Sequence, residues 1–453
     1  MTVKKEAKET IRFVDEYCEK YEEVFKEDYR HLENYKYMMI GMISEIKRKS
    51  LPEIAKVVGL KDNQILHHFI ANSPWKTADL REKRIELIKQ AIGEREIILC
   101  IDETGDKKKG KTTDYVKRQY IGNLGKIENG IVAVTAFGVI ENITFPITFE
   151  IFKPKDRLKE IEVEKEINGE KIKQKEEHKT KIQIAKEMVE EIVKKGFKIK
   201  IVLADSEYGE ATEFRRLLEK LKLKFVLATR SNHAVWMPKD QYIRYNKWKE
   251  FNREFSNGDK ELRYIREIVY GKRNPNHTNR YYILTTDKET LPQESTYYIM
   301  TNLEGKIEKT VGNIYGLRTW IEYGLKQSKN QLGWADFRFT DYLNIERWWE
   351  LVFCAYLLVS LQSSCFRLNP TNPTNPTNPI NSINSIDTFR KHPRWDHSKG
   401  WNNLLNNLRL IIQPYIFFYL INPWLSIFPI PSFSDNFATL ISFMNQFSHL
   451  FPI

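Results

Sequence analysis

Two carboxylates follow apolar runs that are typical of buried strands. Asp102 ends the run IILCID, and Asp205 ends the run IVLAD. A carboxylate at the C-terminal end of a buried strand is held at the edge of an open α/β sheet, where active sites form. Two of them on adjacent strands could share a hard divalent cation, which prefers oxygen ligands. Each aspartate alone could instead cap a strand end or pair with a cation, so a metal site needs a third carboxylate.

A third carboxylate lies in the segment EKTVGNIYGLRTWIEYGLKQSKNQLGW, which we expect to be helical. At about 100° per residue, four polar residues of this segment fall within about 60° of one another on one helix face. These are Tyr315, Arg318, Glu322 and Lys329. Such a face combines one metal-ligand carboxylate with two cations and a hydroxyl that could hold phosphates. We therefore predict that Asp102, Asp205 and Glu322 are catalytic and bind two Mg²⁺ ions, for which Mn²⁺ substitutes.

The order Tyr, two residues, Arg, three residues, Glu, six residues, Lys resembles the motif of a large group of bacterial insertion-sequence transposases of the DDE class. The segment IDETGDKKKGKTTDYVKRQYIGNLGKIENG and the segment LADSEYGE are similar to the blocks that carry the two aspartates in the seven-hundred-and-one type of this group. The likeness spans residues 45 to 430, approximately. It implies a ribonuclease H-like core and cut-and-paste transposition: cleavage at the element ends and joining of the 3′ ends to target DNA.

The resemblance also implies partners and contacts. The substrate would be double-stranded DNA, namely the terminal inverted repeats of the element and the target, and a homodimer would pair the two ends. Arg318 and Lys329 would hold phosphates near the cut, and Tyr315 would contact the backbone. An aromatic side chain would stack on a flipped base; the candidates are Trp236, Trp248 and Trp320. Two alternatives remain open, an endonuclease that cuts without joining and an inactive DNA-binding descendant of a transposase.

Basic residues follow the first aspartate directly, in DKKKGK and just beyond it. Contact with DNA phosphates is one interpretation and a solvated run of charge is the other. The residues concerned are Lys108, Lys109, Lys111 and Arg118. Two further carboxylates, Glu103 and Glu207, adjoin the predicted site. Strand alternation points Glu103 away from the side of Asp102, so neither is assigned to catalysis.

Residues 1–92 are expected to be helical and to bind DNA, since no Gly precedes Gly41 and no Pro precedes Pro52. Within them, Ala55, Gly59 and Ile65 have the spacing of a helix-turn-helix over residues 51–70. Gly59 would make the turn and Ile65 would anchor the second helix, although an ordinary helical hairpin fits the same spacing. In a helix-turn-helix the second helix would present Lys61, Asn63, Gln64 and His67 or His68 to DNA.

From Glu96 onward the hydrophobic period changes. EIILCID, NGIVAVTAFGVI and ITFPITFEIF predict three strands, a charged loop or hairpin follows over residues 157–181, and helix, strand, helix and strand come next. This order indicates an α/β protein with a mixed sheet, and it is also the order of a ribonuclease H-like core. We assign residues 93–231 and 304–364 to the catalytic core, 232–303 to a β-rich insertion, 365–390 to a low-complexity linker and 391–453 to an apolar tail.

The bulk composition fits these assignments. The chain of 453 residues is long enough for two or three folded units, and its net charge of +12 suits a polyanionic partner. Four cysteines lie far apart without a CxxC pair, which indicates a reducing cytoplasm rather than a disulfide framework or a zinc site. The N-terminus does not read as a secretory signal. Prolines interrupt the uncharged run between Arg409 and Asp435, so we expect this tail to pack on the protein rather than to span a membrane.

Overall fold

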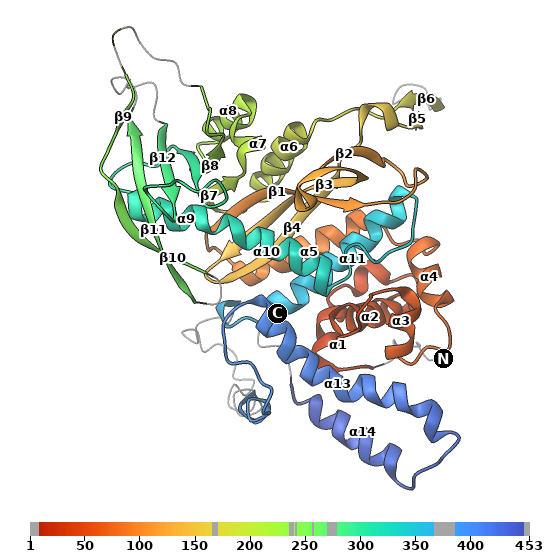
Figure 1. Ribbon diagram of the computed structural model, residues 1–453. Coiled ribbons are helices and arrows are strands. Elements are labelled where there is room, and N and C mark those ends of the chain that lie inside the picture. Colours follow the sequence, from red (N-terminus) through yellow and green to blue (C-terminus); the bar gives the residue numbers. More distant parts are fainter. Residues whose placement is uncertain are drawn as a thin grey trace. The chain divides into compact units, whose positions relative to one another are not determined.

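The chain divides into two compact units (Figure 1). The computed structural model describes residues 9–164, 171–234, 240, 242–255, 258–269, 279–366 and 386–447. The helical unit comprises residues 1–93, 141–146 and 324–453, and the sheet unit comprises residues 94–140 and 147–323. Most of the expected linker and the tryptophan at position 236 lie outside the described residues.

The N-terminal part of the helical unit consists of helices, as the sequence predicts. They are α1 (Arg12–Glu19), α2 (Tyr29–Ile43), α3 (Leu51–Val57), α4 (Gln64–Ala71) and α5 (Thr77–Ile92). Local chemistry sets their starts. Asp28 caps α2 by accepting from the N–H of Arg30 at 2.9 Å, and Pro52 lies in the first turn of α3, where its missing N–H costs nothing.

Gly59 makes the turn between α3 and α4 with a φ of +75°. A Cβ at this position would lie 2.0 Å from Cδ1 of Tyr419, so both the backbone and the packing require glycine. The prediction that Ile65 anchors the second helix is wrong, because this side chain is 50% exposed. Since α4 begins at Gln64, the helical period turns Leu66 and Phe69 inward instead.

The C-terminal part of the helical unit contains α11 (Tyr342–Ser360), α13 (Trp401–Leu425) and α14 (Phe433–Met444). Of the prolines that interrupt the apolar run, Pro414 and Pro423 lie inside α13, against expectation, whereas Pro429 and Pro431 lie between α13 and α14. The indole of Trp401, at the start of α13, stacks on the ring of Tyr356 in α11 with the ring centres 4.2 Å apart.

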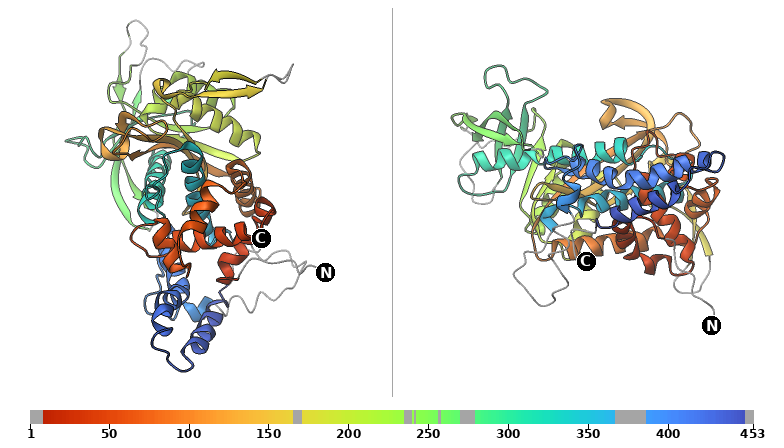
Figure 2. Two further views of the ribbon diagram at one scale, coloured as in Figure 1. Left: turned by 90° about the vertical axis from the view of Figure 1, so that its right-hand side faces the viewer. Right: turned by 90° about the horizontal axis from the view of Figure 1, so that it is seen from below.

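The tail is buried in its first half and exposed in its second. Leu405, Leu408 and Ile412 of α13 are buried, whereas Trp424 and Phe428 are 63% and 66% exposed. Figure 2 shows α13 and α14 as neighbouring antiparallel helices. Among the described residues, α13 is the one helix long and apolar enough to cross a membrane, and 33% of its most apolar stretch is buried inside the protein. A single helix of this kind is weak evidence for a membrane span.

The sheet unit is built on one mixed sheet, which confirms the predicted mixed α/β class. Its strand order is β10-β11-β12-β13-β8-β7-β1-β3-β2, with β4 on β3 and β9 on β11. The pairs β1–β7 and β7–β8 are parallel, and the neighbouring pairs are antiparallel. The first strands are β1 (Ile97–Lys107), β2 (Lys117–Ile121), β3 (Lys126–Ile140) and β4 (Ile143–Ile151). Of these, the short β2 was not predicted.

The predicted alternation after the third strand is confirmed. A hairpin of β5 (Glu160–Glu164) and β6 (Lys171–Lys175) projects from the sheet, as Figures 1 and 2 show. It precedes α6 (Lys181–Lys194), β7 (Ile199–Ala204), α7 (Ser206–Gly209), α8 (Thr212–Lys220) and β8 (Phe225–Thr229). A capping box of Thr180 and Gln183 starts α6.

Residues 232–303 extend the same sheet rather than forming another. Their strands are β9 (Arg244–Tyr245), β10 (Lys249–Glu254), β11 (Lys260–Val269), β12 (Arg280–Thr285) and β13 (Tyr297–Thr301). The last of them, β13, pairs with β8, so the added strands continue the sheet outward from its parallel centre. Helices α9 (Glu308–Gly316) and α10 (Arg318–Gln331) follow.

Candidate active site

Asp102 and Asp205 occupy equivalent places on two neighbouring parallel strands. The pairing of β1 with β7 ends with Ile101 opposite Ala204, so the two aspartates come next on adjacent backbones. Neighbouring strands lie about 4.8 Å apart, which brings the two carboxylates to the same part of the sheet edge. The expectation that Asp102 ends its strand is wrong, since β1 runs on to Lys107. It does so because residues 102–107 keep pairing with β3 on the other side.

Backbone contacts fix both aspartates. The N–H of Glu103 donates to Oδ1 of Asp102 at 2.8 Å, and the hydroxyl of Thr135 donates to the carbonyl oxygen of Asp102 at 3.0 Å. Asp205 caps α7 by accepting from the N–H of Glu207 at 2.9 Å. Each aspartate therefore has a local structural role as well, which the sequence alone could not separate from a catalytic one.

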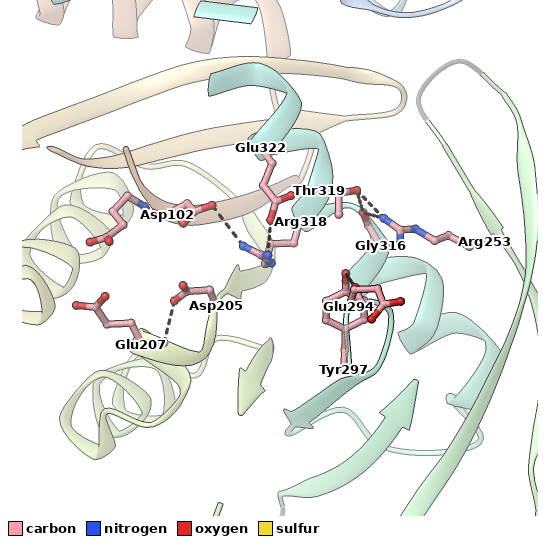
Figure 3. Close-up of polar contacts among 11 residues, drawn as sticks. Asp102, Asp205, Glu207, Arg253, Glu294, Tyr297, Gly316, Arg318, Thr319 and Glu322 are labelled. Carbon is pink, nitrogen blue, oxygen red and sulfur yellow. Dashed lines mark hydrogen bonds and ion pairs between the residues drawn. The ribbon is translucent and has the colours of Figure 1, made fainter. Parts of the chain in front are cut away.

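Arg318 links the first carboxylate to the third (Figure 3). Its Nη1 lies 3.3 Å from Oδ2 of Asp102, and its Nη2 donates to Oε1 of Glu322, one turn further along α10. The side chain of Glu322 is 50% exposed, whereas those of Asp102 and Arg318 are 10% and 13% exposed. The guanidinium thus lies between a fixed buried carboxylate and a carboxylate that solvent can reach.

The charges of the three carboxylates act on one another. Burial raises the pKa of Asp102 to about 7; the guanidinium of Arg318 opposes this shift, and the charges of Asp205 and Glu322 add to it. For Arg318, burial disfavours the charged form, but Tyr315 and the surrounding carboxylates outweigh it and raise the pKa of the guanidinium. In both groups burial disfavours the charged form, whereas the attraction between Arg318 and the carboxylates favours it.

The expectation that the four motif residues share one helix is wrong. The chain is helical up to Gly316 and again from Arg318, with a break at Leu317, so Tyr315 belongs to α9 and the other three residues belong to α10. At the break the N–H of Trp320 donates to the carbonyl of Leu317, three residues back. The carbonyl of Gly316 accepts from the hydroxyl of Thr319 at 2.7 Å instead.

Two of the other predicted motif residues have different environments. Tyr315 is 6% exposed, its ring lies 5.6 Å from that of Tyr297, and burial raises the pKa of its hydroxyl to about 12. Lys329 is half-buried near the end of α10, in the part of this helix that belongs to the helical unit.

The predicted stacking residues are not equivalent. Trp320 is 7% exposed, and its indole nitrogen is buried without a hydrogen-bond partner in the described structure. Trp248 is half-buried, and the guanidinium of Arg266 lies 4.3 Å from its ring centre. The third candidate, Trp236, is outside the described residues.

The basic residues after Asp102 are mostly exposed. Lys108 is partly buried and pairs with Asp106 at 2.6 Å, whereas Lys109, Lys111 and Arg118 are exposed. Solvent exposure is compatible with both interpretations of this charge, phosphate contact and simple solvation.

Sequence reasoning missed a cation on the other flank of the site. Lys181, the first residue of α6, pairs with Glu103 and lies 3.6 Å from Oε1 of Glu207. Burial still raises the pKa of Glu103. Lys181 thus partly neutralises the two carboxylates that adjoin the predicted site, and no short motif marks it in the sequence.

The donor set can be compared with what a divalent cation requires. Among the described residues, no three Asp, Glu, His or Cys side chains are grouped closely enough to hold a metal ion as they stand. The donor type nonetheless fits, because Asp102, Asp205 and Glu322 supply carboxylate oxygens and the pKa of Asp102 responds to both other charges. The side chain of Glu322 is half-exposed, in contrast to the buried Asp102.

Comparison with known proteins points to one kind of enzyme. Residues 21–253 match the family model described as DDE superfamily endonuclease, and residues 173–358 match the model described as Transposase DDE domain. A probable transposase for insertion sequence element IS701 from Microchaete diplosiphon is 50% identical to this chain over 362 residues. The matched region covers 80% of this chain and 90% of that relative.

Proposed function

The chain belongs to the DDE transposases of insertion-sequence elements, and from this premise we propose that Asp102, Asp205 and Glu322 are its catalytic and metal-binding carboxylates. Enzymes of this family act on DNA and use divalent metal ions. The observation that carries the assignment is the bridge from Arg318 to Asp102 and Glu322, beside Asp205 on the adjacent strand. Without a counter-charge, three carboxylates so close together would repel one another.

Two Mg²⁺ ions, with Mn²⁺ as a substitute, are the proposed cofactors. When bound, they would activate the attacking oxygen and stabilise the leaving oxygen of phosphoryl transfer. The protein contributes two carboxylates that backbone hydrogen bonds hold in place and a third that can rotate. As Glu322 turns toward the aspartates, the guanidinium of Arg318 gains freedom to donate to a DNA phosphate. No covalent bond between enzyme and DNA is part of this scheme.

The proposed DNA contacts extend outward from the carboxylates. Tyr315, Arg318 and Lys329 would contact the backbone near the cut, and the exposed Lys109, Lys111 and Arg118, together with Lys108, would contact flanking phosphates. Residues 1–92 would bind DNA through a helix-turn-helix at 51–70, for which the glycine turn at Gly59 and the exposed His67 and His68 give support. Of the two described stacking candidates, Trp248 is more exposed than Trp320.

We assign a ribonuclease H-like core to residues 93–231 and 304–364, interrupted by the β-rich insertion 232–303. The mixed sheet with parallel β1, β7 and β8 at its centre supports this assignment. The proposed reaction is cut-and-paste transposition by a homodimer on paired element ends, in the cytoplasm. Each protomer would cleave one end and join its 3′-hydroxyl to target DNA.

Cleavage of a labelled DNA fragment that carries the element's own ends tests the proposal. We expect the wild-type protein to cut at the element boundary with Mg²⁺ and not with a chelator, and Glu322→Gln to abolish cutting while DNA binding persists. Glu207→Gln is the matched control, because this carboxylate adjoins Asp205 and lies 3.6 Å from Lys181 but is not assigned to catalysis. The assignment would be overturned if Glu207→Gln lost cutting while Glu322→Gln still cut.

A second measurement separates the transposase from a simple nuclease. The same reaction with added target DNA should yield joined products that contain the labelled 3′ end. Cutting without joining would identify an endonuclease, and binding without cutting in Mg²⁺ or Mn²⁺ would identify an inactive descendant.

A further inference from the structure

The edge strand β10 lies along helix α9 in a regular register. Nζ of Lys249 pairs with Oε1 of Glu308 at 2.9 Å. Two residues further along the strand, the ring of Phe251 lies so close to Gly312 that a Cβ there would be 2.5 Å from Cζ. The next residue on the same strand face is Arg253, which meets Gly316, four residues after Gly312 (Figure 3).

This register has a geometric cause. Two residues of a strand advance by about 6.7 Å, and four residues of a helix advance by about 6 Å, so contacts at every second strand residue match every fourth helix residue. The two glycines make the close approach possible, since Gly312 and Gly316 present no side chain to the strand. The N–H of Glu254 also donates to Oδ1 of Asn313 at 3.2 Å, which fixes the strand lengthwise.

Arg253 is the last of the three β10 residues that contact α9, and it is the most unusual of them. It is 6% exposed, and within the described structure no carboxylate lies within ion-pair distance of its guanidinium. Its Nη2 donates instead to the hydroxyl of Thr319 at 2.7 Å and to the carbonyl of Gly316 at 3.4 Å, and its Nε is buried without a partner. Burial of a guanidinium without a counter-charge is costly, and the ring of Phe255, whose centre lies 4.9 Å from the guanidinium carbon, offsets part of that cost.

The two acceptors of Arg253 are the residues that define the break between α9 and α10. Gly316 is the last residue of α9, and Thr319 lies in the first turn of α10, immediately after Arg318. The carbonyl of Gly316 accepts from Thr319 and Arg253 at the short turn around Leu317, and α10 starts there with Arg318 beside Asp102. A cation on the insertion strand therefore contacts the two residues that flank the start of α10.

We propose that Arg253 is a positioning residue: by holding Gly316 and Thr319, it orients Arg318 and Glu322 toward Asp102. The inference rests on the proposed assignment of Asp102, Asp205 and Glu322. It gives residues 232–303 a role in the chemistry that does not require any of them to contact DNA.

Direct contact of Arg253 with a DNA phosphate is the competing account. The cavity between β10, β11 and the helix break, which Arg253, Arg263 and Tyr297 help to line, has a volume of about 10 Å³. That is room for about one water molecule and far too little for a phosphate group. The geometry thus favours a structural role toward α10 over a binding role toward DNA.

The test removes the hydroxyl that accepts from Arg253. Thr319→Val keeps the shape of the side chain, and Thr319→Ser keeps the hydroxyl. We expect Thr319→Val to lower the rate constant of end cleavage at saturating DNA by about 10- to 100-fold, since small misplacements of catalytic groups have effects of this size. Thr319→Ser should stay within about threefold of the wild type. DNA affinity in a chelator should change by less than about twofold in both.

Arg253→Gln distinguishes positioning from phosphate contact. If Arg253 positions α10, the variant loses cleavage rate but keeps the wild-type slope of log affinity against log salt concentration. A slope smaller by about one would mean that Arg253 neutralises a phosphate, and this result would overturn the inference. An unchanged cleavage rate in both Thr319→Val and Arg253→Gln would overturn it as well.

A compensating pair tests the register without touching a polar group. Gly→Ala inside a helix ordinarily stabilises the folded protein. Here Gly312→Ala should instead displace Phe251 and slow cleavage, and Phe251→Leu, which removes Cζ, should restore the rate in the double variant. Normal cleavage by Gly312→Ala alone would show that the register does not position α10.

Failure of this inference can be told apart from failure of the proposed function. If Glu322→Gln still cuts, the catalytic assignment fails. If Glu322→Gln is inactive while the variants at Arg253, Thr319 and Gly312 all cut normally, the catalytic assignment stands and the positioning role alone is wrong.

Discussion

The guanidinium of Arg318 reaches the carboxylate of Asp102 over 3.3 Å, although the two residues are 216 positions apart in the sequence. Its other terminal nitrogen donates to Glu322, so one protein cation lies between two carboxylates that we assign to metal binding. A cation in this place attracts the same oxygens that a divalent ion requires. Under the proposed assignment, Arg318 and the metal ions would compete for the carboxylates in the DNA-free protein.

Arg318→Gln should bind Mn²⁺ more tightly than the wild type when DNA is absent, because the competing charge is gone. We expect the Mn²⁺ concentration at half-saturation, measured from the metal-induced rise in melting temperature, to fall by about fivefold, which corresponds to about 1 kcal/mol. Cleavage should fall at the same time, since the phosphate contact is lost. Arg216→Gln, at an exposed arginine of α8, serves as the control. Weaker Mn²⁺ binding would mean that Arg318 organises the carboxylates rather than competing for them.

The stability of the metal-free protein should depend on the ionisation of Asp102. Burial raises the pKa of this carboxyl to about 7 in the folded protein, whereas its ordinary value is 3.8. Between these values the folded state binds more protons than the unfolded state, so the free energy of unfolding falls as pH rises from about 4 to about 7. The contribution is fully present below the lower value and lost above the higher one.

Melting in a chelator across this range provides the measurement. Between about pH 5 and about pH 8 the wild type should lose roughly 3 kcal/mol more free energy of unfolding than Asp102→Asn. The range covers about two pH units below the folded pKa, and each unit corresponds to about 1.4 kcal/mol. Parallel curves for the two proteins would show that Asp102 is ionised throughout the range.

Local periodicity predicted much of the fold because the elements concerned carry their own signals. The β-branched runs of β1, β3 and β4 and the alternation from α6 to β8 follow from hydrophobic period alone. The extension of the sheet through β13 onto β8 depends on pairing between distant segments, which no local pattern contains. The same holds for the position of Asp102 within β1, since the partner strand β3 prolongs β1 beyond its apolar run.

The candidate site could be proposed from the sequence in its residue types but not in its geometry. Asp102, Asp205 and Glu322 were proposed from two strand-end aspartates and from the resemblance of the helical motif, whereas the helix break at Leu317 has no such signal. That break depends on Arg253, which lies on β10, 63 positions before Gly316 in the sequence. The two glycines four residues apart, Gly312 and Gly316, were the available signal for close packing on one face of α9.

Breaking a buried ion pair in the helical unit should strongly destabilise that unit. Arg84 and Glu350 are both 0% exposed, with Nε and Oε1 2.5 Å apart, and Arg81 pairs with the other carboxylate oxygen at 3.0 Å. Glu350→Gln would leave the buried guanidinium of Arg84 without its counter-charge. We expect the free energy of unfolding to fall by about 3 to 5 kcal/mol in denaturant titrations.

A more exposed ion pair within α5, the helix that carries Arg84, provides the comparison. Lys83 and Glu86 of α5 lie 2.9 Å apart with side chains 25% and 51% exposed. Glu86→Gln should cost less than about 1 kcal/mol, since solvent screens such pairs. Equal losses in the two variants would contradict the view that burial of Glu350 gives its ion pair greater weight.

Two glycines with positive φ allow backbone strain to be separated from packing. Gly59 has a φ of +75°, and a Cβ there would lie 2.0 Å from the ring of Tyr419, whereas Gly93 has a φ of +57° and open space around it. Gly93→Ala should therefore lower the free energy of unfolding by about 1 to 3 kcal/mol from backbone strain alone, because its φ of +57° and ψ of −132° form a conformation that L side chains rarely adopt. Gly59→Ala should cost this amount and about 1 to 3 kcal/mol more, because the added methyl group displaces an aromatic ring.

The additional loss of free energy of unfolding in Gly59→Ala, compared with Gly93→Ala, measures how firmly α13 packs against the turn between α3 and α4. If it arises from the clash, adding Tyr419→Leu to Gly59→Ala should recover part of the lost free energy of unfolding, while the same substitution beside Gly93→Ala should recover none. Equal effects of Gly59→Ala and Gly93→Ala would mean that Tyr419 yields easily and that α13 is held on this turn only loosely. In that case the N-terminal helices would owe little of their stability to the C-terminal tail.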